Sequence, residues 1–247
     1  MKDDKQARPA AKKKRVAPSP AKPATASGTR ARKAAATPAR VAKERRTQES
    51  RSAGMRAQLL QAAIDQLYEH GYAATTTTAV CERARVSRGA MLHHFPTRVD
   101  LMLYVVQAVY EEELRLYHEA LDKVTDPHRR MLMMPRVLWD VLGRPAGVAV
   151  LEVMQGSRSD PVLSTRLTAL QAAIEKDSLK QAGTLLGKSG VSLEAARLMV
   201  WAIRGLSIAR VLSPDPEQVA RSVDMLQKML AAALDSGVLK GKPARRR

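Results

Sequence analysis

The sequence predicts an all-α protein, because two patterns recur beyond residue 50. Apolar residues return every three to four positions, as on amphipathic helices, and no alternating strand pattern of useful length occurs. N-capping residues, prolines and glycines divide these runs into segments of helix length. About 185 ordered residues suffice for one small domain of about 50 residues and one larger helical domain.

Charge is distributed unevenly along the chain. Of 42 Lys and Arg residues, 16 lie in residues 1–51 together with only 4 Asp and Glu, and five more lie in residues 240–247. The residues between them carry only about +1 of the total charge of +18. Residues 1–50 are rich in Ala, Pro, Lys and Arg and have few large apolar residues to bury, which predicts a disordered basic arm. Such an arm either binds a polyanion or serves as a solubilising tail.

Residues 51–97 predict a three-helix head that ends in a helix–turn–helix. A first helix with an apolar stripe stops at Gly71. Hydroxyl groups of Thr75–Thr78 cap the second helix, and Ser87 caps the third. The inward faces of these two short helices and the turn between them hold Val80, Ala84, Val86, Met91 and Phe95.

The outward face of the third helix carries small or hydrogen-bond-donating residues, which suit entry into a DNA major groove. These residues are Arg88, Gly89, Ala90, His93 and His94. Arg88 either binds a guanine bidentately or contacts a phosphate without reading sequence. The pair His93 and His94 does not predict a metal site, because neighbours on a helix diverge by about 100° and no Cys or carboxylate is spaced to complete a ligand set.

Residues 55–101 resemble the DNA-binding end of the TetR family of one-component transcriptional regulators. Agreement runs without a gap over about a fifth of the chain, at Gly71, Thr75, Thr76, Val80, Ala84, Val86, Ser87, Gly89, His93, Phe95, Arg98 and Leu101. The resemblance implies sugar–phosphate contacts from Thr77, Thr78, His94 and Arg98, and base-edge contacts from Arg88, Gly89, Ala90 and His93. Three residues depart from the family pattern: Arg85 replaces a turn glycine, Cys81 an alanine and Leu92 a phosphate-contacting tyrosine.

Residues 98–238 predict a larger helical domain, followed by a basic tail over residues 239–247. Thr97 caps a long helix, and Pro127 begins the next one, which Pro135 either kinks or restarts and Gly143 ends. Asp-Pro pairs and a serine cap predict further helices over about 160–187, 192–212 and 216–234.

The last two of these helices, 192–212 and 216–234, carry more apolar surface than a solvent-facing helix tolerates. The first is apolar around most of its circumference, and the second has one continuous stripe from Val219 to Ala233. We expect both to pair with their copies in a homodimer, the alternative being that they fill the core of one chain. A two-fold dimer would place two heads on DNA half-sites about one helical turn apart.

The resemblance also implies a small-molecule effector, because TetR-like regulators usually respond to one. The candidate pocket residues in the central helices, each of which could also be ordinary core, are Tyr104, Ala108, Trp139, Met154 and Ile174. Aromatic residues make up only 3% of the chain, so a flexible apolar ligand fits better than a stacked planar one.

The sequence thus predicts a ligand-responsive, sequence-specific transcriptional repressor that binds a palindromic operator as a homodimer. Its partners are double-stranded DNA and an unknown small-molecule effector, and no cofactor, metal or catalytic grouping, hence no enzyme, is predicted. A single Cys and the lack of any run of about 18 apolar residues predict a cytoplasmic protein without a membrane span. The alternative is an architectural DNA-binding protein, indifferent to sequence and driven by the basic arm.

Deletion of residues 1–50 separates these two functions. We expect the dependence of the logarithm of DNA affinity on the logarithm of salt concentration to become shallower, by about 0.9 for each phosphate that the arm neutralises, because fewer counterions are released on binding. Preference for one site over random duplex should survive. Titration of the full-length and shortened proteins against both duplexes at several salt concentrations measures both quantities. Loss of site preference would show instead that the arm reads sequence.

Overall fold

The computed structural model describes residues 38–186 and 192–239, and the fold of these residues is all-helical, as predicted. No strand occurs among them. A single short 3-10 turn, η1 (Ser157–Ser159), lies between two of the helices. The helices are α1 (Pro38–Ala74), α2 (Thr77–Ala84), α3 (Arg88–His94), α4 (Arg98–Leu121), α5 (Pro127–Leu142), α6 (Pro145–Gly156), α7 (Pro161–Leu186), α8 (Leu193–Leu212) and α9 (Pro216–Asp235).

Helix caps confirm most of the predicted boundaries. The Thr97 hydroxyl accepts the backbone N–H of Asp100, and the Asp100 carboxylate accepts the backbone N–H of Thr97, so α4 begins with a complete capping box. Gly71 leaves the helical conformation at φ 76° and interrupts α1 as predicted. The side chains that accept backbone N–H groups at the starts of α5, α7, α8 and α9 are Asp126, Asp160, Ser192 and Asp215.

Three boundaries differ from the prediction. α1 begins at Pro38, so helix extends into residues 38–50, which we expected to belong to the disordered arm; residues 1–37 and 240–247 lie outside the described residues. α6 is a separate helix that the sequence did not indicate, because Gly143 and Pro145 marked only the end of the preceding one. α5 continues through Pro135 and does not restart there.

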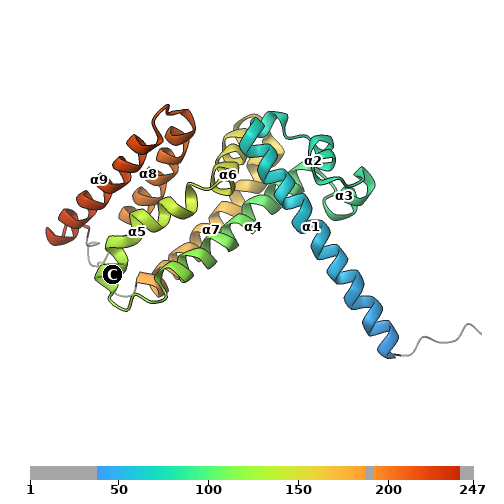
Figure 1. Cartoon of the computed structure of the whole chain (residues 1–247), viewed down its shortest axis with the longest axis horizontal. Coiled ribbons are helices and arrows are strands. Elements are labelled where there is room, and N and C mark those ends of the chain that lie inside the picture. The colour runs from blue at the N-terminus through green and yellow to red at the C-terminus, as the bar shows by residue number, and fades with distance from the viewer. Residues whose placement is uncertain (1–37, 187–191, 240–247) are drawn as a thin grey trace, which may run out of the picture. The chain divides into compact units, whose positions relative to one another are not determined.

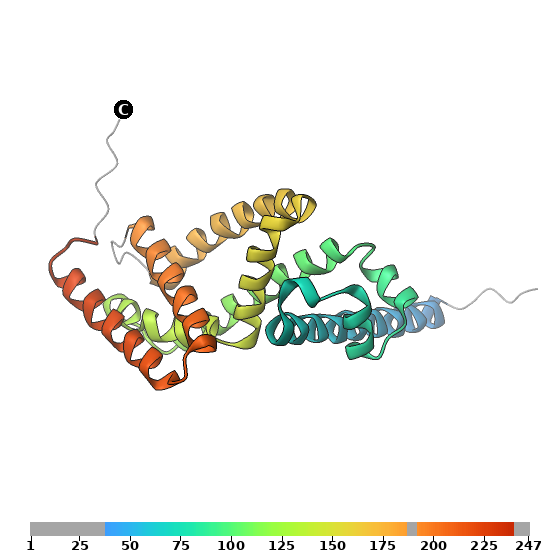
Figure 2. The ribbon, with the colours of Figure 1, turned by 90° about the horizontal axis from the view of Figure 1, so that it is seen from above.

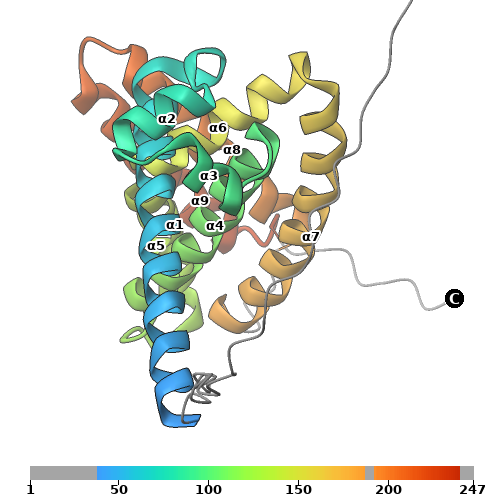
Figure 3. The same cartoon turned by 90° about the vertical axis from the view of Figure 1, so that its right-hand side faces the viewer.

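The arrangement below concerns residues 45–186 and 192–239, which belong to one compact unit. In this unit α2 and α3 lie beside α1, and α4 runs from them toward α5 (Figure 1). α7 lies alongside α4 (Figure 3), and α8 and α9 pack against each other and against α5 (Figures 1 and 2). α4 therefore connects the helix–turn–helix with the larger helical domain.

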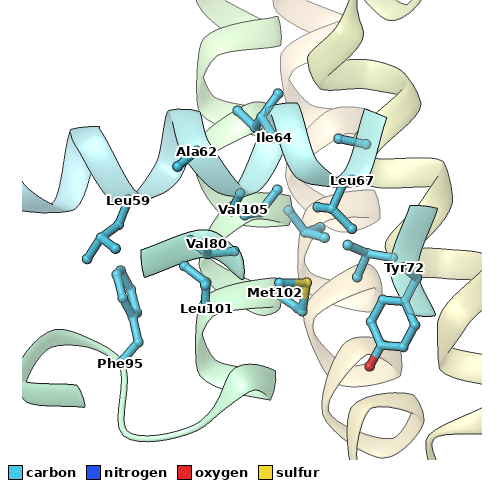
Figure 4. Close-up of a cluster of buried hydrophobic side chains, with 14 of the residues drawn as sticks. Leu59, Ala62, Ile64, Leu67, Tyr72, Val80, Phe95, Leu101, Met102 and Val105 are labelled. Atoms are coloured by element: carbon cyan, nitrogen blue, oxygen red, sulfur yellow. The ribbon is translucent and has the colours of Figure 1, made fainter. Parts of the chain in front are cut away.

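The unit contains two hydrophobic cores. In the first, side chains of α1, α2 and α4 converge with Phe95, which follows α3 (Figure 4). The second joins α5, α8 and α9. α4 contributes to both, since Leu101, Met102 and Val105 lie in the first core and Leu121 lies in the second. Neither core is complete without this helix.

Arg85 is the one non-glycine residue with positive φ in the described part of the chain, at φ 53°. It follows α2 in the left-handed conformation, and its backbone N–H donates to the Glu82 carbonyl. The family pattern has glycine here, which adopts this conformation without steric cost.

We expect Arg85→Gly to raise the free energy of unfolding by up to about 1 kcal/mol, because it removes the contact of Cβ with the backbone in this conformation. Chemical denaturation of the purified protein measures the change. Arg85→Ala is the matched control, since it removes the guanidinium group but keeps Cβ. An equal gain from both variants would assign the effect to the charge of the arginine and not to its backbone.

Candidate nucleic-acid interface

The two short helices of the head are oriented by their caps and by buried side chains. The Thr76 hydroxyl accepts the Ala79 N–H at 3.1 Å, and the Ser87 hydroxyl accepts the Ala90 N–H at 3.2 Å. Inward-facing Val80, Ala84, Met91 and Phe95 are buried, and Val86 packs against the same core, as predicted. The angle between α2 and α3 is thus set by both local and core contacts.

An ion-pair cluster fixes α2 on α1. The two terminal nitrogens of Arg83 lie 2.7 and 2.5 Å from the two carboxylate oxygens of Glu69, and its Nε lies 3.5 Å from Asp65. The hydrogen bonds from Arg83 lower the pKa of Glu69, so the pair is charged at neutral pH. This contact joins the end of α2 to α1.

The residues predicted to contact DNA lie together on the open side of the head, with one exception. Exposed side chains among them are those of Thr78, Arg88 and His93, together with Gly89. Thr77, Ala90 and His94 are half-buried. Leu92, which stands where the family has a tyrosine, is also exposed. Their contacts with DNA stay predictions.

Arg98 is the exception, because its side chain is occupied inside the protein. Its Nε donates to the Thr75 carbonyl at 2.8 Å, and its Nη2 donates to the Tyr72 carbonyl. The guanidinium carbon also lies 3.9 Å from the centroid of the Tyr72 ring. Arg98 therefore joins the end of α1 to the start of α4, a role that the sequence did not reveal, and a phosphate contact from it stays a prediction.

Tyr72 also connects the head with α6 and with the segment that joins α6 to α7. Its backbone N–H donates to Glu152 at 3.2 Å, and its hydroxyl donates to Asp160 at 2.9 Å. Burial and the hydrogen bond to Asp160 raise the pKa of Tyr72 to about 12, so the phenol remains a donor. The ring lies so close to Gly156 that a Cβ there would overlap Tyr72 Cγ.

A second connection runs from the capping box of α4 to α7. Asp100 Oδ1 lies 2.8 Å from Arg166 Nη1, while Asp100 also caps α4. Hydrogen bonds from Thr97, followed by that from Arg166, lower the pKa of Asp100. The start of α4 is therefore tied to both α1 and α7.

A cavity of about 670 Å³ lies between α4, α5, α7 and α8. Of the predicted effector residues, Met154 and Ile174 line it. Ala108 lines a second cavity of about 350 Å³ between α1, α4 and the start of α6, and Glu113 lines both cavities. These placements leave effector contact a prediction for all three residues.

Tyr104 and Trp139, the other two predicted effector residues, line neither of these cavities. The ring of Tyr104 packs on Phe95 with centroids 5.0 Å apart, so it belongs to the head. Trp139 is buried in the second core beside Leu138, but of these two residues only Leu138 also lines the cavity.

The cavity wall contains two charged residues that were not predicted from the sequence, Glu113 on α4 and Arg204 on α8. Glu113 Oε2 lies 3.5 Å from Arg204 Nη2, and both side chains are largely buried. Burial raises the pKa of Glu113, and the charge of Arg204 opposes that shift. The sequence does contain one sign of this buried charge: Glu113 lies four residues after Val109, in a stripe of α4 that is otherwise apolar.

The geometry of the described residues supports neither a metal site nor a reactive thiol at Cys81. Within residues 38–186 and 192–239, no group of three or more His, Cys, Asp or Glu side chains could hold a metal ion. The rings of His93 and His94 meet edge to face with centroids 5.3 Å apart. Cys81 is buried, and desolvation raises the pKa of its thiol, which suits a packing group.

Comparison with known proteins places this geometry in a family. Residues 59–105 match the family described as "Bacterial regulatory proteins, tetR family". Residues 59–105 therefore form a DNA-binding domain of the TetR family. An uncharacterized HTH-type transcriptional regulator of Mycobacterium tuberculosis is 28% identical over 193 residues, which cover 76% of this chain and 99% of that protein. The HTH-type transcriptional regulator CymR of Pseudomonas putida is 27% identical over 196 residues, which cover 72% of this chain and 90% of CymR.

Solved structures show the same TetR fold. GusR of Salmonella enterica superposes with a TM-score of 0.55 at 20% identity, over 74% of this chain and 96% of GusR. The multidrug binding protein EbrR superposes with a TM-score of 0.51 at 22% identity, over 78% of this chain and 98% of EbrR.

With this domain and its similarity to HTH-type transcriptional regulators, the protein is a DNA-binding transcriptional regulator and not an enzyme. Among the helices of its described residues, none is both long and apolar enough to span a membrane.

Gly89 is a sensitive test of the DNA-facing surface. A Cβ at this position would meet no atom within 4 Å, so nothing inside the head requires glycine. We expect Gly89→Ala to stabilise the head by about 0.5 kcal/mol, because alanine has the higher helix propensity. Operator affinity should nevertheless fall by about tenfold if DNA approaches this backbone closely.

Thermal unfolding and titration with a bound site measure these two effects separately. Gly54→Ala on α1 is the control, since a Cβ there also meets no atom within 4 Å and the residue lies outside the predicted interface. If Gly89→Ala binds the operator with unchanged affinity, Gly89 does not belong to the DNA interface.

Proposed function

We propose that this TetR-family protein is a ligand-responsive repressor that binds a palindromic operator as a homodimer in the cytoplasm. The observation that carries the proposal is the course of α4. Its first residue, Arg98, holds the end of the head, and Tyr110, Glu113 and Tyr117 of the same helix line the large cavity. Because α4 contacts the head and also lines the large cavity, a ligand in the cavity can change the position of α3.

The segment between α6 and α7 supplies a second route. Met154, Ser157 and Ser164 line the cavity, while Gly156 and Asp160 contact Tyr72 at the end of α1. A ligand that favours another position of this segment also favours another position of the head. Repression is relieved when the two heads of the dimer can no longer fit both half-sites.

Similarity to EbrR supports a small-molecule effector. EbrR is described as a multidrug binding protein. The cavity here has a mostly apolar wall and a volume in the range of small-molecule sites, roughly 300–1,000 Å³.

We propose that the chain dimerises through α8 and α9. The surface of α9 that takes part differs from the apolar stripe from Val219 to Ala233 that the sequence suggested. Val219 and Val223 of that stripe are buried within the same chain, and Leu226 and Leu230 are partly buried there, where α9 packs on α5. The stripe therefore fills the second core. Large apolar side chains left exposed on these two helices are Leu198, Trp201, Val211, Leu212, Met225 and Met229.

A second copy of the chain is the occupant that fits these exposed residues. Contiguous apolar surface on a soluble domain marks an interaction site. A self-complementary contact between two copies also gives the two-fold symmetry that a palindromic operator requires.

Genome-wide mapping of bound sites tests the proposed function. A recovered site should show two-fold symmetry. At a fixed salt concentration, the affinity of the protein for this site should exceed its affinity for random duplex by a factor of about 10³ or more. A ratio near one would favour the architectural alternative. Addition of small molecules to the bound complex then tests whether any of them releases the operator.

We expect Met225→Glu/Met229→Glu to convert the dimer into a monomer, because it places four charges in a two-fold interface without partners. Sedimentation velocity measures the mass, and operator affinity should fall by about 10²-fold or more when only one head binds. Val162→Glu on α7 is the control, since Val162 is as exposed as Met229 but lies on another helix. A dimer that persists in the double variant would place the interface elsewhere.

A further inference from the structure

The large cavity has a polar feature that its apolar wall does not explain. The side chains of Glu113 and Arg204 are only 8% and 11% exposed, and they meet through one long contact of 3.5 Å. Glu113 Oε1 and Arg204 Nη1 are buried without any hydrogen-bond partner. Buried polar atoms are nearly always paired, because an unpaired one loses its hydration without compensation. This donor and this acceptor therefore lack a group that would satisfy both.

The formal charges on the cavity wall cancel. Besides Glu113 and Arg204, the charged residues lining it are Glu175 and Arg197, which form an ion pair with each other and are each about half exposed. A cation or an anion that entered would lose hydration and find no free counter-charge. The cavity thus favours an uncharged ligand.

The remaining wall is mostly aliphatic. Side chains from α4, α5, α6 and α7 form this part, including Leu114, Met134, Leu138, Leu142, Met154 and Leu167. Met and Leu side chains adapt to flexible aliphatic groups, and they outnumber the three aromatic residues of the lining, Tyr110, Tyr117 and Trp201. An aliphatic body of the ligand fits this part of the cavity.

We infer that the effector, on the proposed function above, is an uncharged, mostly aliphatic molecule whose single amide or hydroxyl group inserts between Glu113 and Arg204. The N–H or O–H of that group donates to Glu113 Oε1, and its oxygen accepts from Arg204 Nη1. Both residues line the cavity, although these two atoms are themselves buried. The terminal torsion of a glutamate is broad and soft, so the carboxylate turns to meet the ligand. The inserted group replaces one long contact by two hydrogen bonds.

Four eight-carbon probes that differ in their head group test this inference on the full-length protein: octanamide, octan-1-ol, octanoate and the octylammonium ion. Fluorescence of Trp201, which lines the cavity, reports binding without DNA. We expect octanamide and octan-1-ol to bind about tenfold or more tightly than either ion. Tightest binding by an ion, equal binding by all four, or no binding by any of them would overturn the inference.

Variants of the two ion pairs test whether Glu113 causes the preference of the cavity for uncharged head groups. Glu113→Gln keeps the shape of the side chain but leaves the charge of Arg204 uncompensated. We expect its preference to shift toward octanoate by about tenfold, because the cavity then carries a net positive charge. Glu175→Gln is the matched control in the half-exposed pair, where water screens the change, and its preference should stay close to that of the parent protein. If Glu113→Gln does not fold, as judged by circular dichroism, the ranking of the probes on the parent protein still decides.

Operator release is measured separately with the same probes. A probe that binds with the expected ranking and leaves the operator bound would count against ligand-responsive repression, while the head-group preference of the cavity would stand. An ion that binds most tightly and releases the operator would overturn the head-group inference and support the repressor function.

Discussion

The burial of α4 in both hydrophobic cores is the constraint on which the rest of this structure depends. The helix has 24 residues and is about 36 Å long at 1.5 Å per residue, so it spans the distance from the head to α5. Its first half packs against α1 and α2, and Leu121 at its end packs among α5, α8 and α9. A core side chain changes position only together with its neighbours, because protein interiors are close-packed. The residues predicted to contact DNA and the cavity wall are therefore parts of one packed assembly.

Polar contacts set the direction of α4, which hydrophobic burial alone leaves free. Apolar contacts are non-directional, whereas hydrogen bonds and ion pairs fix distance and angle. Three of these meet at the start of the helix: the capping box of Thr97 and Asp100, the ion pair of Asp100 with Arg166, and the bonds of Arg98 to the end of α1. The orientation of the head on the helical domain rests on this small group of residues.

The sequence predicted those features that are encoded locally. Capping residues such as Thr97 and Asp160 and the apolar spacing of the head lie within a few residues of the elements they define, so helix boundaries and the helix–turn–helix were accessible. Arg98 shows the limit, because its partners lie 23 and 26 positions away. The ion pair of Glu113 with Arg204 joins helices that are distant in the sequence. The stripe on α9 was visible, but whether it faced α5 or a second copy depended on the tertiary arrangement.

The contact between Gly156 and Tyr72 has a mechanical consequence. Because the aromatic ring lies directly on the glycine backbone, no flexible side chain stands between them to take up a displacement. A change in the position of the main chain at residue 156 therefore requires a change in the position of the Tyr72 ring, near the end of α1.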